Sequence, residues 1–382
     1  MVRKRRPEWD TFSTSLREIF GQTAATVERL ASDEVDLAEG LRVFLRDLRM
    51  SIERRIEEFD SDFPYFMETI RETYHLIADT ADYAIFDCFI DGRKRYRICG
   101  NVGLCDDLNF TASGSDAADS SRSAEAAFST VPSAAVVHGK LEKSQLALDA
   151  AGNFEIIVSG EKPEEGDWLE TKPGTNRIIV RNIFHAPFKE HRRHGAAKLT
   201  IERIDGTSHF PRPLSEQDID AALKRIVEDV SETAERRHAM FTAIDAKARG
   251  RFVDDRGSWG HVKFNPRTWL QQATWELAED EAMVIDLAHP VDASFWVLAV
   301  TNCWMEAQDF RFFPSYVSKY TAKAEADGAI QIVLAPVDLG YSNWIHTAGH
   351  RQGALVWRWN DIAQVPELPS IRIVKLADLL GK

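Results

Sequence analysis

One long internal repeat limits what this chain can fold into. The segment 152–181, which opens with Gly-Asn-Phe-Glu-Ile-Ile-Val, recurs as 328–358, which opens with Gly-Ala-Ile-Gln-Ile-Val-Leu. Each copy carries a tryptophan at the same offset and ends on an arginine, Arg181 in the first copy and Arg358 in the second. Solenoid repeats have periods of about 20–50 residues, so this larger separation indicates a duplicated domain. Positions shared by both copies indicate the fold, and positions unique to one copy are better candidates for function.

The duplication predicts a mainly β protein with α additions. Short strand-like segments separated by Gly, Pro and Asp turns flank both copies, which favours two homologous antiparallel β-sandwich or jelly-roll domains over a parallel α/β sheet. We place these domains at 81–210 and 281–382. The segment 1–80 is expected to be helical, and 211–280 is expected to hold a long connecting helix and a linker.

Helical spacing of apolar residues supports both helical assignments. Leu37, Leu41, Phe44 and Leu48 follow one face of an amphipathic helix, with arginines and glutamates on the other face. In the linker, Ser215 is expected to be the N-cap of the connecting helix, because acidic residues follow it in the first turn.

Two connections in the first half carry their own expectations. The strand-like stretch 83–90 leads into Asp91-Gly92 and then 96–98, which is typical of a β-hairpin with a tight turn. The stretch 111–130 is rich in Ser, Ala and Asp, so it is expected to form a long surface loop, with a lid over a pocket as the alternative.

Composition excludes several classes of function. The net charge of −13 over 382 residues argues against nucleic-acid binding, which depends on a basic face. No apolar run reaches the roughly 18 residues of a transmembrane helix, so no membrane insertion is expected. No signal-peptide pattern follows the basic start, so we expect a cytoplasmic protein.

No cofactor motif appears in the sequence. The four cysteines lack CxxC spacing, which argues against a zinc site or a disulfide framework. The sequence contains no phosphate-binding GxxxxGK[ST] loop and no GxSxG nucleophile elbow. His346 and His350 have four-residue spacing, but this places two ligands on one face only in a helix, and the stretch is expected to be a loop. We therefore expect neither a metal nor another cofactor.

The second copy of the repeat is the chemically richer one. Asn343, His346 and His350 have no counterparts in the first copy, so they are candidates for substrate binding and acid–base catalysis. The alternative is that they satisfy a tight Gly-rich loop through hydrogen bonds. Trp344 and Arg358 do have counterparts, so they are interpreted first as packing residues and second as ligand-binding residues.

A second set of candidates follows the apolar segment 295–300. Strand alternation would place Asn302, Trp304 and Glu306 on one face, where a flat ligand could bind and burial would raise the pKa of Glu306. The alternative is an ion pair of Glu306 with Arg311 or Arg358. Tyr316 is a further candidate, because its phenol can donate a hydrogen bond to a ligand.

Several of these segments resemble a bacterial and fungal family defined only as domain of unknown function 1214. The resembling segments are Ala38-Glu39-Gly40, 96–103, Phe295-Trp296, 302–306, 343–353 and Arg358-Trp359. The resemblance implies two β-sandwich modules with helical additions, and a homo-oligomer. It implies little about a reaction.

The sequence favours a cofactor-independent enzyme acting on a small hydrophobic or aromatic molecule in catabolism. Its chemistry would be that of a lyase, isomerase or hydrolase, with His350 or His346 moving the proton and Glu306 as partner. Two alternatives stay open: a protein that binds a lipid-like or carbohydrate ligand without changing it, and a structural or assembly protein.

Overall fold

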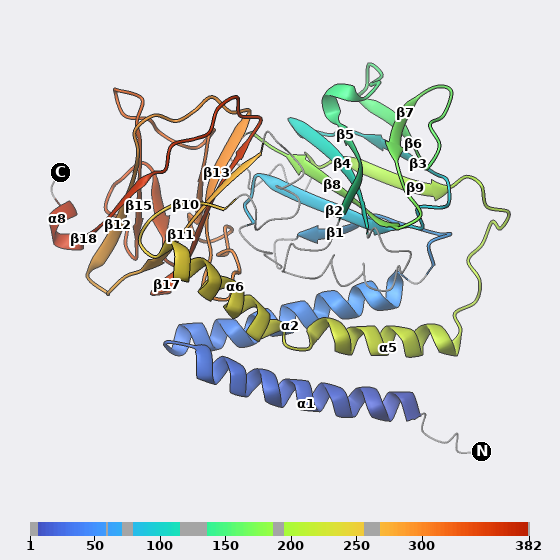
Figure 1. The fold of residues 1–382 in the computed structure, drawn as a ribbon, viewed down its shortest axis with the longest axis horizontal. Coiled ribbons are helices and arrows are strands. Elements are labelled where there is room, and N and C mark those ends of the chain that lie inside the picture. Colours follow the sequence, from blue (N-terminus) through green and yellow to red (C-terminus); the bar gives the residue numbers. More distant parts are fainter. Residues whose placement is uncertain are drawn as a thin grey trace.

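Two sheet-rich modules lie side by side above a layer of helices (Figure 1). The computed structural model of the protein describes residues 7–58, 60–70, 79–114, 136–185, 195–255 and 268–380. The helices are α1 (Pro7–Leu30), α2 (Glu34–Glu57), α5 (Glu216–Val230), α6 (Thr233–Ala248), a short 3-10 turn (Lys143–Gln145) and the short α8 (Leu376–Leu379). None of the described helices is long and apolar enough to cross a bilayer.

The first module is a sandwich of two sheets. Its strands are β1 (Met67–Ile70), β2 (Tyr83–Phe89), β3 (Tyr96–Asn101), β4 (Asp107–Gly114), β5 (Val136–Glu142), β6 (Asn153–Ser159), β7 (Asp167–Glu170), β8 (Thr175–Ile183) and β9 (Lys198–Arg203). One sheet has the order β1-β2-β8-β4-β5 and the other β7-β6-β3-β9. The apolar side chains between the sheets, such as Ile98, Phe110, Ile156 and Val180, form a single buried core.

The second module repeats this arrangement strand for strand. Its strands are β10 (Val253–Asp254), β11 (Trp269–Glu276), β12 (Glu281–Leu287), β13 (Phe295–Val300), β14 (Tyr316–Ser318), β15 (Ile330–Ala335), β16 (Trp344–His346), β17 (Gln352–Asn360) and β18 (Ser370–Lys375). The sheet orders are β10-β11-β17-β13-β14 and β16-β15-β12-β18, which match those of the first module. The predicted pair of homologous β-sandwich modules is confirmed.

The repeated tryptophans explain why this part of the sequence is shared. Trp168 Nε1 donates a hydrogen bond to the carbonyl of Ser159 at 3.0 Å, and Trp344 Nε1 donates to the carbonyl of Ala335 at 3.2 Å. In each module this bond fastens a short parallel edge strand, β7 or β16, to its neighbour, β6 or β15. These edge pairs are parallel, whereas the sequence predicted antiparallel sheets throughout.

Two expectations about connections in the first module need revision. Asp91-Gly92 does not close a hairpin: β2 pairs with β1 and β8, while β3 pairs with β6 and β9 in the other sheet. The turn therefore crosses between the layers of the sandwich, where the amide of Gly92 donates to the carbonyl of Thr175. Within the stretch 111–130, residues 111–114 belong to β4, and the rest of the predicted loop lies outside the described residues.

The connecting segment differs from the expected single long helix. It contains α5 and α6, joined at Ser231 and Glu232, and Glu232 takes a left-handed backbone conformation with φ of 59°. The expected N-cap is confirmed, since the Ser215 side chain accepts from the amide of Asp218. The sheets of the second module begin with β10 and β11, so the expected boundary at 281 falls inside that module.

Helix α2 is bonded to both modules and holds them on the helical layer. Near its C-terminal end, Arg54 Nη2 lies 2.7 Å from Asp87 Oδ2 in β2, and Arg177 Nη1 reaches the same oxygen from β8 at 2.9 Å. Near its middle, Arg46 Nη1 lies 2.6 Å from Glu306 Oε1 of the second module. A buried charge destabilises a fold unless it is paired. These ion pairs therefore allow α2 to pack on the two modules in only one position along its axis.

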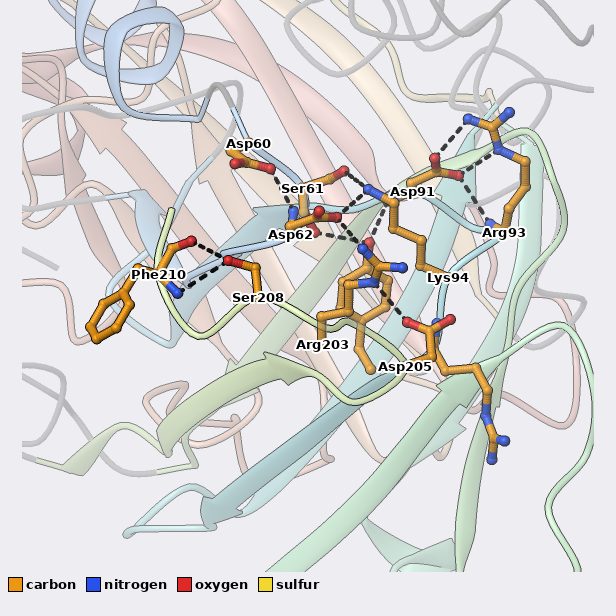
Figure 2. Close-up of polar contacts among 12 residues, drawn as sticks. Asp60, Ser61, Asp62, Asp91, Arg93, Lys94, Arg203, Asp205, Ser208 and Phe210 are labelled. Carbon is orange, nitrogen blue, oxygen red and sulfur yellow. Dashed lines mark hydrogen bonds and ion pairs between the residues drawn. The ribbon is translucent and has the colours of Figure 1, made fainter. Parts of the chain in front are cut away.

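The segment after α2 is fastened to the outer edge of the first module by a polar network (Figure 2). Asp62 accepts hydrogen bonds from Lys94 and from Arg203, and Arg203 Nε also donates to Asp205 at 2.7 Å. Ser61 accepts from Lys94 at 2.9 Å. Lys94 and Arg203 each have a carboxylate partner, so the role of this network is to attach the chain.

Candidate functional site

His350 lies in a buried contact between the second module and helix α2. Its Nδ1 is 3.3 Å from Asp36 Oδ1. Asp36 also accepts from Ser32 Oγ at 2.5 Å and from Gln352 Nε2 at 2.9 Å. Burial alone would raise the pKa of Asp36, but the hydrogen bonds from these three residues hold that pKa well below its usual value. The Nδ1 of His350 and the carboxylate of Asp36 are therefore engaged in contacts within the chain.

Trp304, Asn302 and Glu306 support the same contact. They do not lie on a strand face as expected, because β13 ends at Val300 and 301–307 form a tight turn. The side chain of Asn302 closes that turn by accepting from the amides of Trp304 and Glu306 at 3.0 and 3.1 Å. Trp304 is fully buried and donates through Nε1 to the carbonyl of Asp36 at 2.7 Å.

Glu306 has a partner that the sequence did not suggest. It pairs with Arg46 of α2, whereas the expected alternatives were Arg311 and Arg358. Burial raises the pKa of Glu306, although the charges of Arg46 and Arg237 oppose that rise. The buried ion pair of Glu306 with Arg46 therefore joins α2 to the second module.

Asn343 and His346 lie at the edge of the other sheet. Asn343 Nδ2 donates to the carbonyls of Lys323 and Gln331, and its Oδ1 accepts from the amide of Lys323 at 2.7 Å. His346 Nδ1 accepts from the amide of Ala348 at 2.7 Å, and burial lowers the pKa of this imidazole. Within the described part of the chain, the side-chain hydrogen bonds of Asn343 and His346 reach neither His350 nor Arg358.

Arg358 lies at the junction of the two modules, together with its repeat equivalent. Arg358 on β17 and Arg181 on β8 line one pocket of about 120 Å³, with Tyr83 on its wall. The guanidinium carbon of Arg358 is 5.3 Å from the centroid of the Tyr83 ring, a cation–π contact. Both modules supply its other walls; these residues are Asp107, Asn109, Thr111, Val137, Lys140, Glu142, Ile183, Thr268, Asn360 and Asp361.

Neither arginine has an ion-pair partner among the residues that the structure describes. Arg181 Nη1 donates to Thr111 Oγ1 at 3.3 Å, and the buried Nε of Arg358 makes no hydrogen bond within that part of the chain. Burial and the charge of Arg358 lower the pKa of Arg181 to about 10. Two half-buried like charges that line one pocket without an acidic partner cost free energy, whereas Lys94 and Arg203 in Figure 2 are paired with carboxylates. An anion in this pocket would remove that cost.

The pocket also contains an acid suited to proton transfer. Burial raises the pKa of Asp107, and the nearby carboxylates of Glu142 and Asp361 raise it further. Glu142 itself pairs with Lys140 at the pocket wall. A carboxyl group whose pKa is raised holds its proton more readily than an ordinary aspartate, so Asp107 is a candidate for proton transfer.

Sequence reasoning named only one residue of this pocket, Arg358. Arg181 is the counterpart of Arg358 in the first copy, and an arginine shared by both copies indicates the fold before it indicates a site. Tyr316 lies beside the same junction, in an apolar cluster with Tyr83 and Phe295. One sequence feature could have predicted this pocket: both copies of the repeat carry an arginine at the end of an apolar strand, Arg181 and Arg358.

The module junction makes the stability of the protein depend on pH through Asp82. This aspartate is 1% exposed, and its carboxyl group bonds to Ser318 and Tyr316 of the second module. Burial outweighs these bonds, and Asp79 adds to it, so the pKa of Asp82 is raised to about 7. An unfolded aspartate has a pKa of about 3.9. The contribution of protonated Asp82 to the free energy of unfolding is therefore fully present below about pH 4. It is lost as the pH rises through 7.

Replacing Asp82 with asparagine is expected to raise the free energy of unfolding at pH 8. At pH 5 the same substitution is expected to raise it much less. Three pKa units correspond to about 4 kcal/mol, so an increase of about 2–4 kcal/mol in the free energy of unfolding at pH 8 is expected. Urea denaturation of both proteins at the two pH values measures it. An equal effect of the substitution at pH 5 and pH 8 would show that Asp82 does not titrate in this range.

The chain is similar to solved structures from two bacteria. An uncharacterised protein from Burkholderia cenocepacia is 30% identical, covers 97% of this chain and 97% of its own, and superposes with a TM-score of 0.83. A protein from Vibrio parahaemolyticus is 10% identical over 87% of this chain and 100% of its own, with a TM-score of 0.51, and that likeness shows the fold alone. No family model and no curated protein matches the chain.

Proposed function

We propose that this chain, which belongs to the same protein family as the Burkholderia cenocepacia protein, binds a small organic anion between its two modules. A carboxylate of the ligand would lie against Arg181 and Arg358. The observation that carries the proposal is that these repeat-equivalent arginines meet in one pocket and neither has an ion-pair partner in the described chain. Arginine is suited to this role because its planar guanidinium can hold a carboxylate through two parallel hydrogen bonds. We retain the resemblance to family 1214 as a further proposal.

The dimensions of the pocket limit the ligand to a small molecule. A cavity of about 120 Å³ has room for the volume of about four water molecules. The ring of Tyr83 offers a short apolar surface, and Asn109 and Asn360 add amide groups that can bond to a ligand oxygen. These features favour a short carboxylic acid over the small hydrophobic or aromatic molecule that the sequence suggested.

We also propose that the protein is an acid–base enzyme on this ligand, without a cofactor. Asp107 would supply the proton transfer in place of His350, His346 and Glu306, whose side chains are held by contacts within the chain. Such chemistry belongs to lyases, isomerases or hydrolases, as the sequence suggested. A carboxylate fixed by the two arginines would orient the adjacent carbon or oxygen toward the acid.

Asp107→Asn separates catalysis from binding. The wild-type protein and the variant would be incubated with a panel of small carboxylic acids, and mass spectrometry would follow both retention and conversion. The enzyme proposal predicts that one acid is converted by the wild type, and that the variant retains this acid but converts it at least about 100-fold more slowly.

The binding proposal and the enzyme proposal fail in different ways in this experiment. Retention of an acid without conversion by the wild type would leave a binding protein and reject the enzyme. Equal conversion by Asp107→Asn would reject Asp107 as the proton-transfer group. No retention of any acid would reject both proposals.

A further inference from the structure

The pocket at the module junction is lined by carboxylates as well as by basic groups. Acidic and basic residues are equal in number in its walls: Asp107, Glu142, Asp361, Lys140, Arg181 and Arg358. Lys140 pairs with Glu142, so the remaining charged groups of the lining are two arginines and two aspartates. A ligand that matched this balance would carry one negative and one positive charge.

In the first module the basic and the acidic group lie at different points along one sheet. Arg181 of β8 lies opposite Asn109 of β4. Asp107 of β4 lies opposite Ile183, two residues closer to the C-terminal end of β8. Strand residues two apart point to the same face and are separated by about 6.6 Å. Arg181 and Asp107 therefore share one face of this sheet, and the aspartate lies nearer the end of β8.

The second module repeats this order. Arg358 lies in β17, which ends at Asn360, and Asp361 follows directly after that strand. The ends of β8 and β17 meet at the pocket: Asn360 Nδ2 donates to the hydroxyl of Tyr83 at 3.2 Å, and Tyr83 lies opposite Ile183 of β8. The aspartates of the two modules therefore lie toward the same end of the pocket, and the arginines lie further back along the strands.

Like charges are neighbours at both ends of the pocket. Burial and then the nearby carboxylates, Asp361 among them, raise the pKa of Asp107, and the charge of Lys143 does not cancel that rise. At the other end, burial and then the charge of Arg358 lower the pKa of Arg181. An anion would relieve the repulsion only between the arginines. A cation beside the aspartates would relieve the other repulsion, so a ligand with both charges is favoured over a simple carboxylate.

We infer that the ligand of this pocket is a small amino acid in its zwitterionic form. The inference rests on the proposed anion site, since the carboxylate of the amino acid would lie against Arg181 and Arg358. Its ammonium group would donate to the carboxylate of Asp361, which also accepts from Ser294 Oγ at 2.8 Å. The cavity of about 120 Å³ limits the side chain of the amino acid to a few atoms. Asp107 stays available for the proposed proton transfer.

Matched ligands test the inference on the wild-type protein. Calorimetry would compare glycine with acetate and glycolate, and alanine with propionate and lactate. Within each set the ammonium group is replaced by hydrogen or by a neutral hydroxyl. At least one amino acid should bind about 10–100-fold more tightly than its simple acid, as expected for a hydrogen bond between charged groups, and more tightly than its hydroxy acid.

This comparison separates the failure of the inference from the failure of the proposed function. Simple acids that bind as tightly as their amino acids, or more tightly, would overturn the inference and leave the anion site in place. Binding of none of these ligands would reject the anion site itself, and the inference with it.

Asp361→Asn tests the residue assigned to the ammonium group. Asparagine keeps an oxygen that can accept from Ser294 and tolerates the left-handed backbone at this position, where φ is 55°. The variant should bind acetate at least as tightly as the wild type and should lose the preference for glycine. Asp205→Asn is the matched control, because Asp205 is bonded to Arg203 in the network of Figure 2, and this variant should keep the preference. A preference for glycine that persists in Asp361→Asn would overturn the inference.

Discussion

Gly40→Ala is expected to lower the free energy of unfolding by about 2 kcal/mol. A methyl group at this position would lie 2.7 Å from two ring carbons of Trp304 and 2.7 Å from Val27 Cγ1, closer than carbon atoms can approach. Trp304 cannot move aside, because it is fully buried and its Nε1 donates to the carbonyl of Asp36. Overpacking a core costs about 1–3 kcal/mol. The contact that would be forced apart is the one that joins α1 and α2 to the second module.

Gly21→Ala is the matched control for this substitution. Gly21 also lies inside a helix, α1, but a methyl group there would meet no atom within 4 Å. Alanine is favoured over glycine in a helix interior by about 0.5–1 kcal/mol, so this variant is expected to be more stable than the wild type. Urea denaturation of the three proteins gives the comparison. Stabilisation by both substitutions would show that α2 does not pack closely on Trp304.

Arg181→Gln and Arg358→Gln are expected to weaken the binding of small carboxylates by about 10–100-fold each. A hydrogen bond to a charged group contributes about 1.5–3 kcal/mol, and each arginine supplies at least one to the proposed ligand. Without a ligand, either substitution should raise the stability of the protein, by about 1 kcal/mol, because it removes one of two neighbouring positive charges. Residues that only maintain the fold would lower the stability when replaced. The account therefore predicts that binding and stability change in opposite directions.

Arg203→Gln provides the contrast from within the same chain. Arg203 is bonded to Asp62 and Asp205 in the network of Figure 2, so its loss should lower stability and leave carboxylate affinity unchanged. Calorimetry would measure affinity, and thermal denaturation without ligand would measure stability. Arginine variants of the pocket that lose stability and keep their affinity would assign Arg181 and Arg358 to the fold alone.

The repeat and the helical spacing were enough to predict the architecture. Equivalent strands carry equivalent apolar patterns, and a shared tryptophan fastens the same edge strand in both modules. Connections were less predictable, since the same residues can close a hairpin or cross between two sheets. The choice at Asp91-Gly92 depends on the bond from Gly92 to Thr175, a residue far along the chain.

The candidate site was less predictable because its partners come from distant parts of the sequence. His350 is paired with Asp36, and Glu306 with Arg46, both on α2, and no local pattern indicates either contact. The comparison of the two copies favoured residues that differ between them. A site formed where the modules meet can instead use the same residue from each copy, as Arg181 and Arg358 show. Only the relative placement of the modules reveals this.

The most direct test of the anion site is a thermal-denaturation titration with small carboxylic acids, from formate to malonate and benzoate, each paired with its neutral amide. The account predicts that at least one acid raises the melting temperature of the wild type in a saturable way, that its amide does not, and that the Arg181→Gln/Arg358→Gln double variant does not respond. The account is contradicted if no acid stabilises the wild type more than its amide, or if the double variant responds as the wild type does.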